Sequence, residues 1–157
     1  MSHATENRAL VELDTSEPVW DRFFTVAPLV LVGTVDPDGS FDLAPKHMIT
    51  PMGFDNYFGF VCTPSHGTYQ NIEAYGEFTV SFPRPDQTLL TSLSASPRMA
   101  GISKTEQIID SLPTCRASEV DALYLEQSYL MLECKHFKTI HGFGRNSLIT
   151  ATIRHAS

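Results

Sequence analysis

A chain of 157 residues is the usual length of one domain, and its composition, 42% hydrophobic and 18% charged, excludes a disordered chain. The formal net charge of −7, without a run of basic residues, excludes an extended surface for nucleic acid or an anionic membrane, although a local positive charge could still hold a small anion. The three cysteines are far apart, and the polar N-terminal stretch lacks the apolar core of a signal peptide. We therefore expect one cytoplasmic domain over residues 1–157, with free thiols and no membrane-spanning segment.

The N-terminal third of the sequence predicts an arm, a short helix and a β-hairpin. Residues 1–14 are expected to form a flexible arm, and residues 16–28 a short amphipathic helix, because Ser-Glu-Pro is a favourable helix start. The β-branched residues 29–35 predict a first strand, and residues 41–50 a second. Between them, Asp-Pro-Asp-Gly at residues 36–39 is a typical turn sequence, so this is the clearest hairpin in the chain.

The middle of the sequence predicts a strand, a helix and another strand. The apolar and aromatic residues 57–63 predict a strand that Pro64 ends. Residues 65–75 predict a helix, with Gly76 in the position that glycine favours after a helix C-terminus. Apolar and polar residues alternate over residues 78–82, which predicts a half-buried strand.

The last part of the sequence is less regular. Residues 87–94 predict a helix, and the rest of residues 86–118 predicts a loop. Residues 123–137 predict one long strand and residues 147–153 the last strand. About six strands, joined mostly by hairpin-like turns, favour a mainly β fold, an antiparallel barrel with helical decoration, over a sheet of alternating βαβ units.

Two prolines, Pro45 and Pro51, bracket the first candidate site. Because proline has no backbone N–H, the strand between them cannot pair fully at either end, and its free backbone groups could contact a planar ligand. The simpler interpretation is an ordinary edge strand that runs into a turn.

The second candidate site is the start of the helix predicted over residues 65–75. A helix N-terminus offers unpaired N–H groups and the positive end of the helix dipole, and Ser65 and Thr68 could add their hydroxyl groups. Gly67 would let a ligand approach the backbone closely, so the site suits a phosphate. The simpler interpretation is that Ser65 caps its own helix.

The sequence predicts neither a metal site nor a nucleophile. His47, His66, His136 and His141 lack the spacing of metal ligands, and no cysteine lies close enough in the sequence to complete a site. No serine stands in a Gly-x-Ser-x-Gly setting. We therefore assign no metal and no catalytic residue.

Taken together, these segments resemble the flavin-reductase-like family, the FMN-binding split barrels. The similarity lies in the order and spacing of short segments, which are PLVLVGTV at residues 28–35, DG at 38–39, AP at 44–45, TP at 50–51, Phe54, TYQNI at 68–72 and GEFTVS at 76–81. The resemblance implies an FMN-binding split β-barrel, antiparallel and of Greek-key type.

The resemblance also implies roles for both candidate sites. The first would lie along the isoalloxazine ring, and the second would hold the ribityl phosphate, which makes the implied cofactor-binding residues Lys46, His47, Met48, Ile49, Thr50, Pro51, Ser65, His66, Gly67 and Thr68. His47 is a candidate neighbour of the ring, although a core or surface histidine is the simpler role, and Asn71 is expected to brace the loop rather than touch the cofactor. The implied protein is a homodimeric NAD(P)H-dependent flavin reductase that uses FMN rather than FAD and serves a monooxygenase or another electron acceptor.

The sequence departs from the family before the last strand. Family members commonly carry an Asp-His pair there, whereas this chain has Gly-Phe-Gly-Arg-Asn at residues 142–146. Arg145 could contact a phosphate or substrate or simply be a turn residue, and the role of the family histidine is not transferred to the displaced His141. This departure keeps open a non-enzymatic FMN-binding electron carrier, and the fold alone also allows a split barrel that binds another ligand such as haem.

Overall fold

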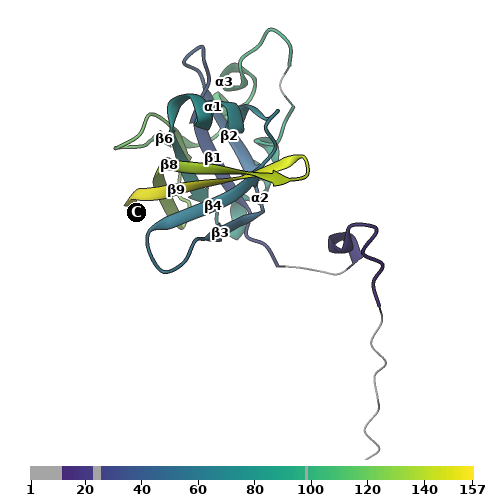
Figure 1. Ribbon diagram of the computed structural model, residues 1–157. Coiled ribbons are helices and arrows are strands. Elements are labelled where there is room, and N and C mark those ends of the chain that lie inside the picture. Colours follow the sequence, from purple (N-terminus) through teal and green to yellow (C-terminus); the bar gives the residue numbers. More distant parts are fainter. Residues whose placement is uncertain (1–11, 23–25, 98) are drawn as a thin grey trace, which may run out of the picture.

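The computed structural model describes residues 12–22, 26–97 and 99–157. Its main feature is a seven-stranded antiparallel sheet with the strand order β2-β1-β5-β8-β9-β4-β3, accompanied by a two-stranded sheet of β6 and β7 (Figure 1). Three short α-helices, α1 to α3, and three 3-10 turns, η1 to η3, complete the described part of the chain.

The elements have the following bounds in chain order: η1 Val19–Arg22, β1 Val30–Val35, β2 Phe41–Lys46, β3 Ile49–Pro51, β4 Tyr57–Cys62, α1 Gly67–Tyr75, β5 Glu77–Phe82, η2 Pro85–Gln87, α2 Thr88–Leu93, α3 Lys104–Gln107, η3 Ile109–Ser111, β6 Thr114–Arg116, β7 Leu123–Leu125, β8 Leu130–Phe143 and β9 Asn146–Ala156.

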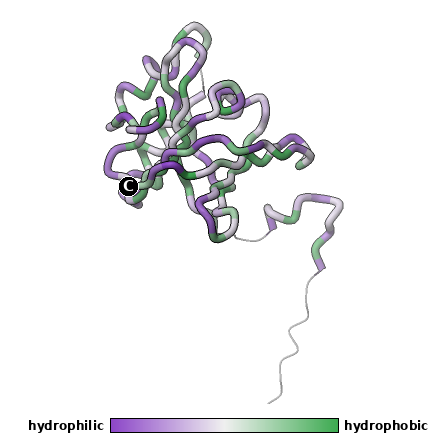
Figure 2. The backbone as a smooth tube through the Cα atoms, turned by 60° about the vertical axis from the view of Figure 1, so that its left-hand side comes forward, coloured by the Kyte–Doolittle hydropathy of each residue, from purple (hydrophilic) through white to green (hydrophobic). Residues whose placement is uncertain are grey.

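The amphipathic helix predicted over residues 16–28 is wrong in its extent. The structure has only the 3-10 turn η1, and residues 26–28 are not helical, while residues 23–25 lie outside the described residues. The side chain of Trp20 is 71% exposed, and η1 lies apart from the sheet in both views (Figures 1 and 2). Little apolar burial is therefore available to stabilise a longer helix, and isolated short helices are marginal in water. Most of the predicted arm, residues 1–11, also lies outside the described residues.

The predicted hairpin is confirmed, but its second strand is shorter than expected. β1 and β2 pair from Val30↔Lys46 to Val35↔Phe41, and the amide of Gly39 donates to the carbonyl of Asp36 at 2.9 Å within the turn. The strand predicted over residues 41–50 breaks after β2, and β3 pairs with β4 at the opposite edge of the sheet. The chain crosses here from one sheet edge to the other, which a single continuous strand could not do.

The hydrophobic core shows that the sheet is strongly curled. Val30 and Val32 of β1 belong to the same buried cluster as Phe58 and Phe60 of β4, although these strands lie next to opposite edges of the sheet. Phe60 also contacts Phe78 of β5 edge to face, with ring centroids 5.6 Å apart. The sheet therefore wraps round its core and leaves β2 and β3 as the two edges of a split, which confirms the antiparallel split-barrel prediction.

Strand β5 is covered on both faces, so the prediction of a half-buried strand is wrong. Thr79 and Ser81 are fully buried because β7 packs over them. The hydroxyl of Thr79 donates to the carbonyl of Leu123 at 2.5 Å, and the amide of Leu125 donates to the hydroxyl of Ser81 at 3.0 Å. Polar side chains on this face satisfy backbone groups of β7 instead of facing water.

The helix predicted over residues 87–94 is confirmed as α2, but the loop predicted for the rest of residues 86–118 contains α3, η3 and β6. Ser103 and Glu106 form a capping box at the start of α3. From α3, the hydroxyl of Thr105 bonds both the amide and the carbonyl of Phe41, at 2.8 and 3.0 Å. Lys104 donates to the carbonyl of Leu43 at 3.1 Å, so side chains of α3 cover part of the free edge of β2.

The single long strand predicted over residues 123–137 is also wrong. It consists of β7, which pairs with β6, and the first part of β8, which pairs with β5 and β9. The break includes Gln127, which has a φ of 59°, a conformation that ends a regular strand. The last strand is confirmed and is longer than predicted, and the β8–β9 hairpin projects beyond the curled sheet (Figures 1 and 2).

Candidate functional site

The first candidate segment, residues 46–51, crosses the split of the barrel. Lys46 ends β2 and is half-buried, whereas His47 and Met48 are exposed at the break between the two strands. Ile49 packs against the core, and Thr50 and Pro51 are exposed in β3. No other strand in the described part of the chain pairs with the outer edge of β3. The segment is therefore an edge strand, as the simpler interpretation held, and its outer backbone groups face the split.

The second candidate segment, residues 65–68, precedes and begins helix α1. The N-cap residue is His66, with φ −81° and ψ 141°, and no side chain caps the helix. The simpler interpretation, in which Ser65 caps the helix, is therefore wrong. Ser65 and His66 are exposed, and Gly67 is half-buried at the first helical position. A first turn without a side-chain cap has N–H groups available to an anion.

Thr68 is the buried polar residue of this helix start. The residue is 2% exposed, but its hydroxyl oxygen is not one of the buried side-chain atoms that lack a hydrogen-bond partner in the described part of the chain. A phosphate oxygen is a suitable partner for this hydroxyl, so this helix start fits the phosphate group of a flavin nucleotide.

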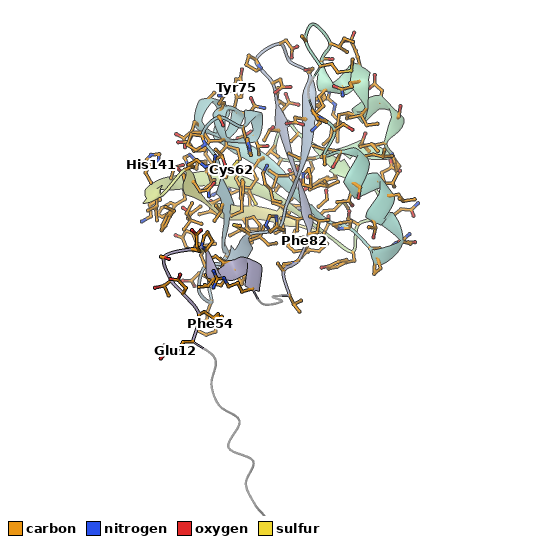
Figure 3. The ribbon with its side chains drawn as sticks, turned by 90° about the vertical axis from the view of Figure 1, so that its right-hand side faces the viewer. Glu12, Phe54, Cys62, Tyr75, Phe82 and His141 are labelled. Carbon is orange, nitrogen blue, oxygen red and sulfur yellow. The ribbon has the colours of Figure 1, made fainter. Side chains whose placement is uncertain are left out.

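Strand β4 links the two candidate segments. The amide of Val61 in β4 donates to the carbonyl of Met48 at 2.9 Å, which holds the crossing segment against the strand that leads into α1. The thiol of Cys62 accepts a hydrogen bond from the backbone amide of Tyr69 in the first turn of α1. Figure 3 shows the labelled Cys62 inside the molecule, near the helix that ends at the labelled Tyr75.

Charge interactions connect Lys46 with Cys62. Burial lowers the pKa of Lys46, and the neighbouring Cys62 and Asp42 partly oppose this effect. Burial likewise raises the pKa of the Cys62 thiol, which Lys46 and interactions with the backbone of Tyr69 and Thr63 partly offset. Because its pKa is raised above the ordinary value of 9.0, Cys62 stays a neutral thiol near neutral pH.

A hollow of about 580 Å³ lies on the other flank of α1, beside the β1–β2 turn. Ser65 and Gly67 line it together with the carboxylates of Asp36 and Asp38. As predicted, Asn71 braces this region, because its amide donates to the hydroxyl of Thr34 at 3.0 Å and to Asp36 at 2.8 Å. The two carboxylates make this flank less suitable for a phosphate than the flank of Thr68 and Lys46.

The hairpin between β8 and β9 reaches the same corner of the molecule. Phe143 pairs with Asn146, so Gly144 and Arg145 form a two-residue turn in which Arg145 is exposed. The hydroxyl of Thr63, just before α1, donates to the side chain of Asn146 at 2.8 Å.

The displaced His141 lies at the base of this hairpin. Its Nδ1 lies 3.0 Å from the hydroxyl of Ser147, which is the residue paired with Cys62. The sequence alone did not indicate that this histidine lies near the helix start, because only the pairing of β9 with β4 places it there.

Two expected absences concern the described residues alone. Within residues 12–22, 26–97 and 99–157, no three or more metal-ligating side chains gather where they could hold a metal ion. In the same part of the chain, no helix has the length and apolarity needed to cross a membrane.

Comparison with known proteins gives both a family and a fold. The model of the "Flavin reductase like domain" family matches residues 23–157. The structure of 2-nitrobenzoate 2-nitroreductase from Pseudomonas fluorescens is similar with a TM-score of 0.79 and 19% identity, over 94% of this chain and 76% of that chain. A split-barrel protein from Shewanella frigidimarina has a TM-score of 0.73 and 18% identity, over 83% of this chain and 66% of that chain.

A third similar structure is the NADH:FAD oxidoreductase of Streptomyces globisporus, with a TM-score of 0.73 and 15% identity, over 83% of this chain and 74% of that chain. This chain thus spans between 66% and 76% of the lengths of these three proteins, and at such low identities the likeness is one of fold. Because the family model covers nearly all of the curled sheet and both candidate segments, the chain belongs to the flavin-reductase-like domain family and is an oxidoreductase of that family.

Proposed function

We propose that this protein binds FMN in the split of its barrel and catalyses its reduction by NADH or NADPH. The observation that carries the proposal is that β4 links the crossing segment to the start of α1: Val61 of β4 bonds the carbonyl of Met48, and Cys62 at its end interacts with the backbone of Tyr69. An isoalloxazine ring needs an extended backbone edge, and its phosphate needs N–H groups and positive charge. Residues 46–51 supply the first, and the start of α1 supplies the second.

The chain's own contribution is binding and orientation. The outer backbone groups of β3 would contact the polar edge of the ring, while Ile49 anchors the same strand in the core. His66, Gly67 and Thr68 would hold the phosphate. Flavin, when bound, supplies the hydride-accepting chemistry, which requires stacked rings more than a set of catalytic side chains.

The nicotinamide donor and the electron acceptor belong to the same proposal. The similar Streptomyces globisporus protein is an NADH:FAD oxidoreductase, which supports a nicotinamide donor for this chain as well. We expect the reduced flavin to serve a monooxygenase or another electron acceptor in the cytoplasm. The same comparison makes FAD the competing flavin. We expect FMN because it carries one terminal phosphate, which is the group that the helix start at residues 65–68 would bind.

The first experiment is a titration of the purified apoprotein with FMN, followed by flavin fluorescence and the visible spectrum. We expect saturable binding of one FMN per chain, and weaker binding of FAD in a parallel titration. Absence of binding by either flavin would contradict the proposed function.

Steady-state oxidation of NADH and NADPH in the presence of excess FMN then tests the reaction. We expect turnover with at least one of the two nucleotides. Tight FMN binding without turnover would instead identify a non-enzymatic electron carrier, the alternative suggested by the Gly142-to-Asn146 segment that replaces the family's Asp-His pair.

A further inference from the structure

We propose that residues 12–22 of one copy of the chain, the η1 segment, lie on the β8–β9 hairpin of a second copy. The inference rests on the homodimer that the family resemblance implies, and it is independent of the proposed flavin site. It names the occupant of a basic and aromatic surface that the described part of one copy leaves exposed.

The charge of the β8–β9 hairpin is opposite to that of the whole chain. Residues 134–157 contain no acidic residue and four cations, a net charge of +4 in a chain whose total is −7. These cations are Lys135, Lys138, Arg145 and Arg154. All four side chains are exposed, and the ion pairs among the described residues include none of them. Two such hairpins facing each other would repel, so this surface favours an acidic partner.

The hairpin also presents apolar side chains beside its cations. Phe137, Ile140 and Phe143 are exposed on β8, and the Nζ of Lys138 lies 5.2 Å from the centre of the Phe137 ring. Exposed apolar surface of this kind is typical of an interaction site. Its best complement is therefore a segment that combines carboxylates with large apolar side chains.

The η1 segment has that combination. It contains four acidic residues and one arginine, which leaves a net charge of −3. The side chains of Glu12 and Glu17 are exposed, and those of Leu13 and Trp20 are 41% and 71% exposed. A short 3-10 turn with so little burial is marginal on its own, so contact with another surface would stabilise it.

The positions of the two features favour contact between copies. In Figures 1 and 2 the η1 segment and the projecting end of the β8–β9 hairpin lie on the same side of the curled sheet, with a gap between them. A second copy that covers one of them is therefore placed to cover the other. In a two-fold symmetric dimer every contact occurs twice, so each η1 segment would lie on the hairpin of the partner.

Trp20 is the single tryptophan of the chain, so its fluorescence reports directly on the η1 segment. The apoprotein is diluted at low and at high NaCl, and the Trp20 emission is followed together with the mass from light scattering. We expect emission at a shorter wavelength from the dimer and a shift to longer wavelength as the dimer dissociates. Dissociation should be easier at high NaCl, because salt screens exposed charges.

Charge reversal tests the contact itself. Glu12→Lys/Glu17→Lys reverses the segment, and Lys138→Glu/Arg145→Glu reverses the hairpin. We expect each double variant to raise the dimer dissociation constant about tenfold at low NaCl, and the combination of all four substitutions to return it toward the wild-type value. Reversal of the segment changes the net charge from −7 to −3, which alone would strengthen the dimer, so a weaker dimer indicates a local contact.

Asp110→Lys/Glu119→Lys is the matched control, because it changes the net charge equally at exposed positions outside both surfaces. It should neither weaken the dimer nor change the Trp20 emission of the dimer. Thermal unfolding checks the folding of each variant. If the hairpin variant does not fold, the segment variant and the control still decide the matter, because η1 lies apart from the sheet.

Mixing the two double variants separates contact between copies from contact within one copy. Each variant alone has a segment and a hairpin of the same charge, whereas a mixed dimer pairs opposite charges at both contacts. We expect the mixture to form dimers in which Trp20 emits at the wild-type wavelength. An unchanged emission after mixing would place the segment on its own hairpin and overturn the inference.

Two further results would also overturn it. One is a reversed segment that changes neither the Trp20 emission nor the dimer, and the other is a fourfold variant that does not recover. A monomeric wild type would overturn the inference together with the homodimer. The proposed function would stand or fall separately, because the FMN titration tests it.

Discussion

Thr68, at the start of α1, is a buried threonine. Two other buried threonines bond backbone carbonyls, Thr79 that of Leu123 and Thr91 that of Gln87. Thr68 is equally buried, but no described residue bonds its hydroxyl. A hydroxyl that no described residue bonds is available to a ligand.

The isosteric substitution Thr68→Val separates binding from folding. Because the hydroxyl has no partner among the described residues, its removal should leave the free energy of unfolding unchanged or slightly higher, while the FMN dissociation constant rises about tenfold. Urea denaturation and FMN titration measure the two quantities. The control is Thr91→Val, which should lose about 1 kcal/mol of stability and keep its FMN affinity, because the Thr91 hydroxyl donates to Gln87 at 3.0 Å. A stability loss in Thr68→Val as large as that of the control would mean that its hydroxyl serves the fold.

Sequence reasoning about single residues succeeded where the partners are local. The Asn71 brace could be predicted because it joins a helix to a turn that the sequence also predicts. The environment of Lys46 could not be predicted in this way. Its burial depends on where β2 ends and on the position of β4, a strand with which β2 does not pair. The N-cap of α1 was placed one residue too early, since Pro64 and Ser65 form a turn before the helix starts.

At the scale of elements, Glu133 of β8 holds the loop of residues 117–122. Its carboxylate is 1% exposed and accepts hydrogen bonds from the amide and hydroxyl of Ser118, at 3.0 and 2.7 Å, and from the amides of Glu119 and Val120, at 2.5 and 2.9 Å. Burial alone would raise the pKa of Glu133, but these four hydrogen bonds outweigh it and lower the pKa below its ordinary value of 4.5.

This arrangement predicts a pH-dependent stability. Since the folded-state pKa of Glu133 is lowered, its contribution is present above about pH 4.5 and is lost as the pH falls. Glu133→Gln should destabilise the protein by about 2–3 kcal/mol at pH 7, and the difference from wild type should shrink in acid. Urea denaturation at pH 7 and pH 4 measures both effects. Glu119→Gln is the matched control, because the structure uses only its backbone amide. A difference that stays constant between the two pH values would contradict the assigned role of the carboxylate.

The elements that could be predicted are those with local signals. The β1–β2 hairpin has a turn sequence, and α1 ends at Gly76, whose φ is 72°. The break between β7 and β8 has no such signal, because Gln127 in the left-handed region is unusual and a Glu-Gln-Ser sequence is not a typical turn. Helix α3 did have one, the Ser-x-x-Glu capping box at residues 103–106, but a four-residue helix is too short to show periodicity.

For the whole molecule, the β8–β9 hairpin is the main exposed apolar feature among the strands. Phe137 and Phe143 are each 53% exposed and Ile140 is 37% exposed, all in β8. In Figure 2 hydrophobic residues recur along this projecting ribbon. The family resemblance implies a homodimer, and we propose that its two copies associate through this hairpin.

Light scattering of the purified protein measures this association. We expect a mass twice the 17.4 kDa of one chain, and a shift toward the monomer in Phe143→Glu, which places a charge within the apolar surface. Leu89→Glu changes a side chain that is 79% exposed on α2 and should leave the dimer intact. A monomeric wild type at micromolar concentration would rule out the proposed dimer.

The side chains of α3 have a consequence for the protein without its flavin. An unpaired strand edge can template the addition of further strands, and hence aggregation, and a split barrel has two such edges. Here Thr105 and Lys104 occupy backbone groups of β2, while the opposite edge, β3, has only three residues and ends in a proline. A chain protected at both edges can release its flavin after reduction without becoming prone to aggregate, which suits a protein that delivers reduced flavin to another enzyme.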